Sequence, residues 1–163
     1  MRNIKVLVVD DQEPLAQELR SILSTDEELQ VVGIALDGFQ ALEQLALTPA
    51  DVVLLDIRMP NMNGVVATQR LKAEFPDCKV LILTTFDDSD YILNAINNGA
   101  SGYLLKDIGG AALVSAVKNA YAGDTILPAK IAKRIADAAK QVAVTREIKL
   151  MLSDPRRGWT RWQ

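Results

Sequence analysis

Short apolar runs recur five times along the chain, and residues with helical spacing of apolar positions follow each run. The run Val52–Leu55 contains no polar residue, which is typical of a strand covered on both faces. The other four runs occupy residues 4–9, 29–36, 80–84 and 103–105. The pattern therefore predicts five short strands that alternate with helices.

The helical segments begin and end at residues that suit helix termini. Pro14 opens the first segment at a first-turn position, and Pro76 terminates the segment over residues 65–75. The remaining helices are expected after Gly38, through Ile92 to Ile96, and over residues 111–122. Parallel strands need crossover connections of this kind.

This alternation favours a parallel sheet with helices on both faces. The expected fold class is α/β, a flavodoxin-like (βα)5 doubly wound parallel sheet of order 2-1-3-4-5, with a C-terminal linker helix. In that order, strands one and three are neighbours, and ligands bind beyond the carboxyl ends of the strands. The residues at these strand ends are therefore the first candidates for a functional site.

Charged and hydroxyl residues stand at four of the five predicted strand ends. Asp10 and Asp11 follow the first strand, Asp56 follows the third, Thr84 ends the fourth and Lys106 follows the fifth. Taken separately, Asp56 fits a strand-end cap, Thr84 a hydroxyl in a local turn, and Lys106 a solvated charge. Their shared location favours one common site instead.

Three crowded carboxylates repel one another, and a divalent cation would relieve that repulsion. The all-oxygen environment favours Mg²⁺ as the cofactor. Asp11 and Asp56 are the best candidates for direct ligands, with Asp10 nearby or acting through water. The backbone carbonyl of Arg58 is a candidate for completing the protein's share of the ligands.

Asp56 is also a candidate nucleophile, because a carboxylate can form an aspartyl phosphate. The transferring phosphoryl group needs positioning and charge neutralisation more than covalent help. Mg²⁺ would neutralise one oxygen, the Lys106 ammonium a second, and the Thr84 hydroxyl would donate to a third. These residue types indicate phosphoryl chemistry at Asp56.

Composition narrows the choice of chemistry. The 163 residues include no histidine, which excludes imidazole bases, Ser-His and Cys-His nucleophile pairs, and a phosphohistidine on this chain. The single cysteine, Cys78, excludes an intramolecular disulfide and favours a reducing compartment. Because no apolar run suits a signal peptide or a membrane span, a cytoplasmic protein without membrane contact is expected.

Several ordered motifs resemble the receiver domain of two-component response regulators. They are the Asp10-Asp11 pair, Asp56 with the following Met-Pro-Asn-Met-Asn-Gly, Thr84-Thr85, and Gly-Ala-Ser-Gly-Tyr-Leu-Leu-Lys ending at Lys106. The resemblance implies that a partner histidine kinase phosphorylates Asp56 with Mg²⁺ bound. It also implies that Thr84 and Tyr103 act as switch residues, the Tyr103 ring turning inward.

The residue after Lys106 departs from the commonest receiver pattern and resembles one branch of the family. Many receivers have a proline there, whereas this chain has Asp107. Leu-Leu-Lys-Asp resembles the NarL/FixJ/LuxR-type branch, whose receivers usually precede a LuxR-like helix-turn-helix. The resemblance implies a signalling domain rather than an enzyme. It also implies a role in transcription and a homodimer that forms on phosphorylation.

The charge is unevenly distributed along the chain. Residues 1–127 carry 9 Lys/Arg and 18 Asp/Glu, whereas residues 128–163 carry 9 and 3. The expected organisation is a receiver domain over residues 1–124, a linker helix over 125–150, and a basic, Trp-containing tail over 151–163.

The tail is too short for a three-helix DNA-binding domain, so DNA is expected as a partner only if such a domain is missing. A truncated regulator, a stand-alone receiver and an altered reading frame all remain open. An apolar stripe in the expected linker suits either a homodimer or packing on the chain's own core. Its members are Ile131, Ile135, Ala138 and Val142.

Other functions fit the residues less well. A haloacid-dehalogenase-like phosphatase would want an Asp-x-Asp nucleophile after strand one, and a flavin or nucleotide binder would want a phosphate loop there. A degenerate receiver that binds partners without phosphorylation would not need the complete residue set. Arg58 and Phe86, just past Asp56 and Thr84, are expected to shield the phosphoryl group from water.

Overall fold

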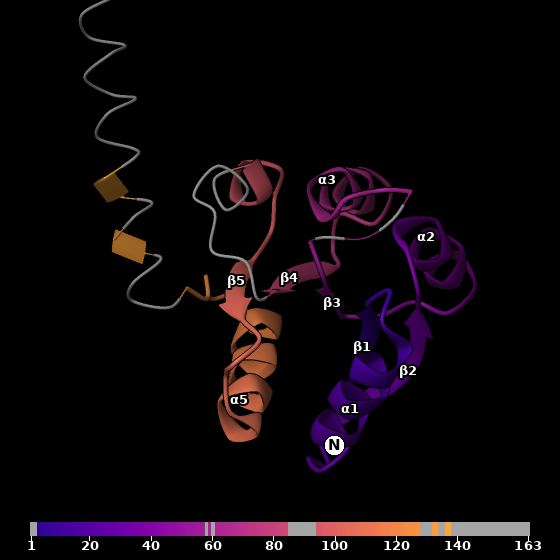
Figure 1. Cartoon of the computed structure of the whole chain (residues 1–163), viewed down its shortest axis with the longest axis vertical. Helices are drawn as coiled ribbons and strands as arrows, with labels where there is room; N and C mark the ends of the chain where they lie inside the picture. Colours follow the sequence, from indigo (N-terminus) through magenta and orange to yellow (C-terminus); the bar gives the residue numbers. More distant parts are fainter. Residues whose placement is uncertain are drawn as a thin grey trace, which may run out of the picture. The chain divides into compact units, whose positions relative to one another are not determined.

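The structure of the chain is a computed structural model (Figure 1). It describes residues 3–57, 59, 61–84, 94–127, 132–133 and 136–137. The chain divides into two compact units, Met1–Pro128 and Ala129–Gln163. The sheet and its covering helices all belong to the first unit.

Strands and helices alternate along the first unit. In chain order they are β1 (Ile4–Val9), α1 (Glu13–Leu23), β2 (Leu29–Ala35), α2 (Gly38–Leu47), β3 (Val52–Leu55), α3 (Gly64–Glu74), β4 (Lys79–Thr84), β5 (Gly102–Leu105) and α5 (Gly110–Tyr121). Residues 94–97, between β4 and β5, are also helical, which agrees with the helix predicted there. The beginning of that helix, with Ile92, lies outside the described residues.

The five strands form one parallel sheet of order β2-β1-β3-β4-β5, which confirms the predicted topology. The register decides where the strand ends meet. Val9 at the end of β1 pairs with Leu55 at the end of β3, and Thr84 pairs with Leu105. Residues that follow these pairs therefore leave the sheet at one edge.

Helices cover both faces of the sheet, as Figure 1 shows: α1 and α5 pack together on one face, and α2 and α3 on the other. Val52–Leu55 is at most 1% exposed along its length, which confirms the prediction of a strand covered on both faces. Val8, Leu54 and Leu81 belong to the cluster on the α1 and α5 side. Burial of these side chains is the main force that holds the helices on the sheet.

Helix termini follow the local signals in the sequence. Pro14 lies in the first turn of α1, where a missing N–H costs nothing. Asp37 and Asn63 are the N-caps of α2 and α3, and their side chains accept hydrogen bonds from the N–H groups of Gln40 and Val66. These caps fix the points at which the chain leaves the two loops next to the strand ends.

The outer edge of β5 is extended by a short bridge from Ile126. The N–H of Tyr103 donates to the Ile126 carbonyl at 2.9 Å, and the N–H of Ile126 donates to the Ser101 carbonyl at 3.0 Å. A Cβ on Gly102 would lie 2.4 Å from the Ile126 carbonyl oxygen, so this close approach requires glycine. The linker helix expected over residues 125–150 therefore does not include Ile126.

Most of the expected linker and the whole tail over residues 151–163 lie outside the described residues, as does the apolar stripe. Residues 132–133 and 136–137 of the second unit are helical. None of the helices among the described residues combines the length and the apolar character of a membrane-spanning segment.

Candidate functional site

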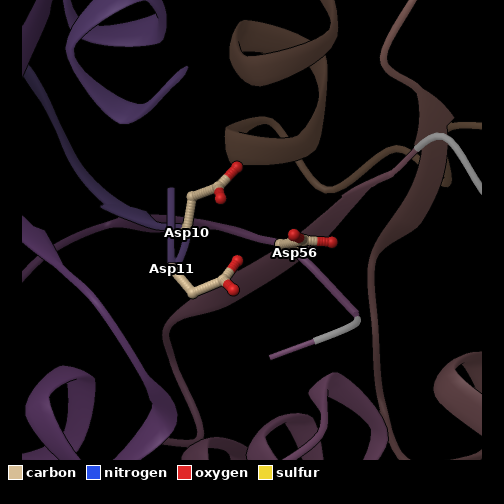
Figure 2. A group of neighbouring side chains, drawn as sticks. All are labelled: Asp10, Asp11 and Asp56. Atoms are coloured by element: carbon tan, nitrogen blue, oxygen red, sulfur yellow. The ribbon is translucent and has the colours of Figure 1, made fainter. Parts of the chain in front are cut away.

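Three acidic side chains converge at the carboxyl ends of β1 and β3. Asp10 and Asp56 directly follow the paired residues Val9 and Leu55, so the sheet register places them side by side. The carboxylate oxygens of Asp10, Asp11 and Asp56 include atoms that all lie within 4.8 Å of one another. Figure 2 shows the three carboxylates around one common space. The sequence prediction that these acids meet is confirmed.

Asp10 is held firmly within this group. It is 1% exposed, and its backbone N–H donates to the Ala35 carbonyl of β2 at 3.0 Å. One carboxylate oxygen accepts from the Gln12 N–H at 2.9 Å, and the other accepts from Lys106 Nζ at 2.9 Å. A buried carboxylate needs such partners, since burial without them is costly.

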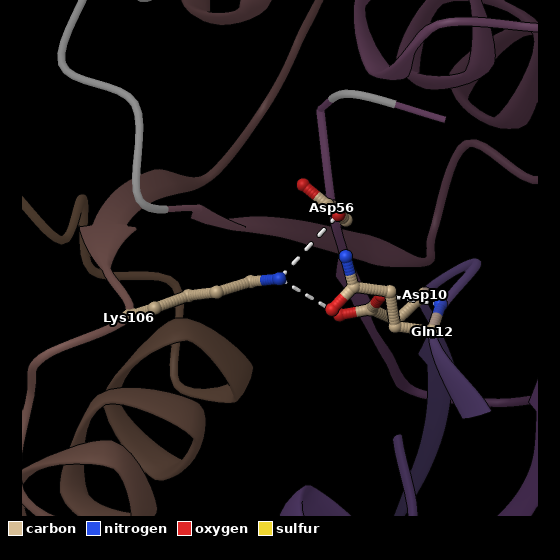
Figure 3. Close-up of polar contacts among 4 residues, drawn as sticks. All are labelled: Asp10, Gln12, Asp56 and Lys106. Atoms are coloured by element: carbon tan, nitrogen blue, oxygen red, sulfur yellow. Dashed lines mark hydrogen bonds and ion pairs between the residues drawn. The ribbon is translucent and has the colours of Figure 1, made fainter. Parts of the chain in front are cut away.

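Lys106 reaches the acids from the end of β5, as Figure 3 shows. Its Nζ lies 2.9 Å from Asp10 Oδ2 and 3.4 Å from Asp56 Oδ2. Burial lowers the pKa of the Lys106 ammonium, but the hydrogen bond to Asp10 and the charges of Asp56 and Asp10 outweigh burial and raise it above 10.5. Lys106 is therefore positively charged at neutral pH.

Asp56 is 8% exposed, and its N–H donates to the Val9 carbonyl at 3.0 Å, so its backbone is fixed to the end of β1. Asp11 is the exposed member of the group. The group is therefore buried at Asp10 and Asp56 and exposed to solvent at Asp11.

The loop after Asp56 folds back against it. The N–H of Gly64 donates to the Ile57 carbonyl at 2.7 Å. A Cβ on Gly64 would lie 2.4 Å from the Ile57 Cα and 2.9 Å from the Asp56 carbonyl oxygen. Only glycine lets the start of α3 approach this closely, so Gly64 sets the path of the loop.

The donor set suits a hard divalent cation. Asp10, Asp11 and Asp56 offer oxygen atoms only, and three carboxylates face the single ammonium of Lys106 in this group. That excess of negative charge is the environment that Mg²⁺ prefers, with water and phosphate oxygens as further ligands. The residues therefore fit the magnesium ion that the sequence predicts.

The structure does not describe every predicted site residue. Thr84 ends β4 and pairs with Leu105, which places its backbone beside the site, but its side chain is outside the described part. Arg58 and Phe86 also lie outside the described residues, so the predicted carbonyl ligand and shielding roles stay predictions. Tyr103 lies in β5 with no exposed area, so its ring is inside the protein in this conformation.

One hydrogen bond near the site is not predicted by the sequence. Asn61 Nδ2, in the loop after Asp56, donates to Asp37 Oδ2 at 3.2 Å. The only local signal was that Asn61 stands between Pro60 and Met62 in a predicted turn. Nothing in the spacing of the chain links that turn to Asp37.

Comparison with known proteins identifies a family model that matches this chain. The model described as Response regulator receiver domain matches residues 6–118. The matched segment includes the three acids and Lys106, together with all five strands except the first residues of β1.

Curated relatives match over the same region. The transcriptional regulatory protein LnrK of Bacillus subtilis (strain 168) is 41% identical over 138 residues, which cover 85% of this chain and 63% of LnrK. The oxygen regulatory protein NreC of Staphylococcus carnosus (strain TM300) is 36% identical over 129 residues, 78% of this chain and 59% of NreC. The chain thus spans about 60% of the length of these two relatives.

Solved structures share the fold. A LuxR-family two-component response regulator from Aurantimonas sp. SI85-9A1 is similar with a TM-score of 0.79 and 28% identity, over 84% of this chain and 98% of that one. The response regulator ChrA of a heme-sensing two-component system is similar with a TM-score of 0.69 and 33% identity, over 94% of this chain and 78% of that one.

Proposed function

Because the chain belongs to the response regulator receiver domain family, with relatives of the NarL/LuxR type, we propose that Asp56 accepts a phosphoryl group from a partner histidine kinase. The domain is a signalling domain rather than a classical enzyme. The observation that carries the proposal is the meeting of Asp56 with Asp10, Asp11 and Lys106 at the ends of three strands.

The transfer step uses the Asp56 carboxylate as the nucleophile. An Asp56 oxygen attacks the phosphorus of the kinase phosphohistidine, a P–O bond forms, and the P–N bond breaks with its electron pair left on the imidazole nitrogen. Lys106, 3.4 Å from Asp56, is placed to offset charge on a phosphoryl oxygen. Its raised pKa keeps the ammonium charged throughout the neutral range.

Asp10, Asp11 and Asp56 would hold Mg²⁺, with the Arg58 carbonyl as a further ligand. When bound, Mg²⁺ would neutralise charge on the phosphoryl oxygens. Asp10 keeps its place through the hydrogen bonds from Gln12 and Lys106, so it holds the cluster together whether or not it is a direct ligand.

The conformational response is assigned to the switch residues that the family resemblance indicates. The Thr84 hydroxyl would donate to the phosphoryl group, and Tyr103 would retain the inward position that it already has in this structure. The name of LnrK, a transcriptional regulatory protein, supports transcription as the controlled output in the longer proteins. A homodimer formed on phosphorylation belongs to the same proposal, and contact with DNA belongs to it only if a helix-turn-helix domain is missing from this chain.

The test is intact-protein mass spectrometry after incubation with Mg²⁺ and acetyl phosphate. The wild-type chain should gain the mass of one phosphoryl group, and Asp56→Asn should gain none, because the amide is not a nucleophile for this transfer. Asp124→Asn is the matched control, since Asp124 is an exposed acid that follows α5. A wild-type chain without mass gain, or an equal gain in Asp56→Asn, would refute the proposal.

The same experiment separates the alternatives. A haloacid-dehalogenase-like phosphatase would place its nucleophile after β1, so Asp10→Asn or Asp11→Asn rather than Asp56→Asn would lose the covalent phosphate. A receiver that works without phosphorylation would show no mass gain in any variant. The convergence of Lys106 with the acids supports the phosphorylated receiver over this last alternative.

A further inference from the structure

Two loops next to the site are joined by one carboxylate. Asp37, in the loop between β2 and α2, accepts through Oδ1 from the Gln40 N–H at 2.8 Å and through Oδ2 from Asn61 Nδ2 at 3.2 Å. The first bond caps α2, and the second holds the loop that connects β3 to α3. Because the two bonds use different oxygens, Asp37 makes both at once.

The held loop is shaped to receive this bond. Asn61 has φ of 69°, in the left-handed region that asparagine tolerates better than most residues. Beside it, Met62 is 5% exposed and packs against the start of α2, where a Cβ on Gly38 would lie 2.7 Å from its Sδ. The loop therefore rests on α2 through one polar and one apolar contact.

Asn61 and Asp37 each lie a few residues from a backbone hydrogen bond that involves Asp10 or the residue after Asp56. Asn61 is three residues before Gly64, whose N–H binds the Ile57 carbonyl at 2.7 Å directly after Asp56. Asp37 is two residues after Ala35, whose carbonyl accepts from the Asp10 N–H at 3.0 Å. Hydrogen bonds thus connect Asp37, through short backbone segments, both to Asp10 and to the loop that follows Asp56.

We propose that Asp37 is a positioning residue for phosphoryl transfer, because its bond to Asn61 fixes the backbone after Asp56 relative to Asp10. The inference rests on the proposed function, since the transfer to Asp56 is the reaction whose rate it sets. Transfer depends on placement of the acceptor oxygen relative to the neighbouring charges, so a small displacement slows it. Asp37 itself does not touch the reacting atoms.

The test compares initial rates of phosphorylation by acetyl phosphate at saturating Mg²⁺, followed by intact-protein mass spectrometry. Asn61→Gly removes the amide but allows the positive φ, and Asp37→Ser keeps a capping oxygen on a side chain too short to reach Asn61. Each variant should slow phosphorylation by about three- to tenfold, on the scale of the net contribution of one ordinary hydrogen bond. The double variant should be no slower than the slower single variant, because both remove the same bond.

A second pair of substitutions tests rescue. Asn61→Asp sets two carboxylates against each other and should slow phosphorylation. Combining Asn61→Asp with Asp37→Asn exchanges the donor and the acceptor of this bond and keeps a capping side chain at position 37. The combined variant should therefore return the phosphorylation rate to within about twofold of wild type. A purely structural role for Asp37 as a helix cap would not produce this recovery.

Asp26→Ser is the matched control. Asp26 also uses one oxygen for a backbone N–H, that of Glu28, and the other for a side chain, that of Lys118. It precedes the opposite end of β2, so its loss should lower stability without slowing phosphorylation. This control separates a general loss of stability from a local effect on Asp56.

The outcomes distinguish the two proposals. If wild type gains no phosphoryl group, the proposed function and the positioning role both fail. If wild type is phosphorylated but Asn61→Gly and Asp37→Ser match its rate, only the positioning role is overturned. Additive losses in the double variant, no recovery in the exchanged pair, or equal slowing by Asp26→Ser would overturn it as well.

Discussion

Gly64→Ala is a sharp test of how the fold positions Asp56. The added Cβ would lie 2.4 Å from the Ile57 Cα, whereas ordinary van der Waals contact begins at 3.4 Å. The two nearest atoms, the Ile57 Cα and the Asp56 carbonyl oxygen, belong to the backbone, so no side-chain rotation relieves the overlap. The loop and the start of α3 must therefore separate by about 1 Å, the difference between these two distances.

This displacement gives the expected magnitudes. Overpacking of this kind costs about 1–3 kcal/mol, and the better helix propensity of alanine returns at most about 1 kcal/mol. The net loss in the free energy of unfolding should therefore be about 0–3 kcal/mol. Because the Asp56 carbonyl is among the displaced atoms, phosphorylation of Asp56 should slow by about ten- to a hundredfold.

Two measurements check these values. One is the midpoint of urea unfolding, compared at an unchanged m-value, and the other is the rate of mass gain with acetyl phosphate and Mg²⁺. Gly109→Ala is the control, since a Cβ at Gly109 has no atom within 4 Å and its φ is −69°. It should change stability by less than about 1 kcal/mol and leave the phosphorylation rate unchanged. A Gly64→Ala chain that keeps both the wild-type midpoint and the wild-type rate would refute the reasoning.

Two further substitutions test the charges. Asp11→Asn should weaken Mg²⁺ binding by about tenfold or more in calorimetric titration, or about 1.4 kcal/mol, and an unchanged dissociation constant would contradict the proposed magnesium site. Lys118→Met removes the hydrogen bond that, as the largest cause, lowers the pKa of Asp26 below 3.8. The wild-type pair therefore stabilises fully above pH 3.8 and loses this effect as pH falls through the lowered pKa, so the difference in unfolding midpoint should shrink on acidification.

The pattern of apolar residues predicts most of the fold because each strand and helix is marked by its own residues. The fully apolar Val52–Leu55 is a strand in the structure without change of bounds, and Pro76 stands just beyond α3 as expected. Once the strand order is known, the register carries Asp10 and Asp56 to one edge. The convergence of acids therefore follows from local patterns and one topological rule.

Contacts between loops could not be predicted in this way. The bond between Asn61 and Asp37 joins residues 24 positions apart, and its existence depends on how two turns face each other. The closeness of Gly64 to Asp56 likewise depends on the path of the loop between them. Sequence periodicity describes the surroundings of one element, whereas these contacts depend on the distance between two elements.

The sequence predicts the location of Lys106 but not which acid it binds more closely. Its position after β5 predicts a role beside Asp56, but the structure places its ammonium closer to Asp10, at 2.9 Å, than to Asp56, at 3.4 Å. The sequence offers no means to rank these two partners. Lys106 lies closer to Asp10 because Asp10 is more deeply buried than Asp56 and therefore depends more on a counter-charge.

The position of the Lys106 ammonium, closer to Asp10 than to Asp56, matters for the proposed conformational switch. Phosphorylation would add negative charge at Asp56, and the Lys106 ammonium would then be drawn from Asp10 toward the phosphoryl oxygens. Lys106 directly follows β5, the strand that also carries Tyr103 and meets Ile126 at its outer edge. Because β2 lies at the other side of the sheet and carries no contact to Lys106 among the described residues, we expect the response to concentrate at β5 and its neighbours.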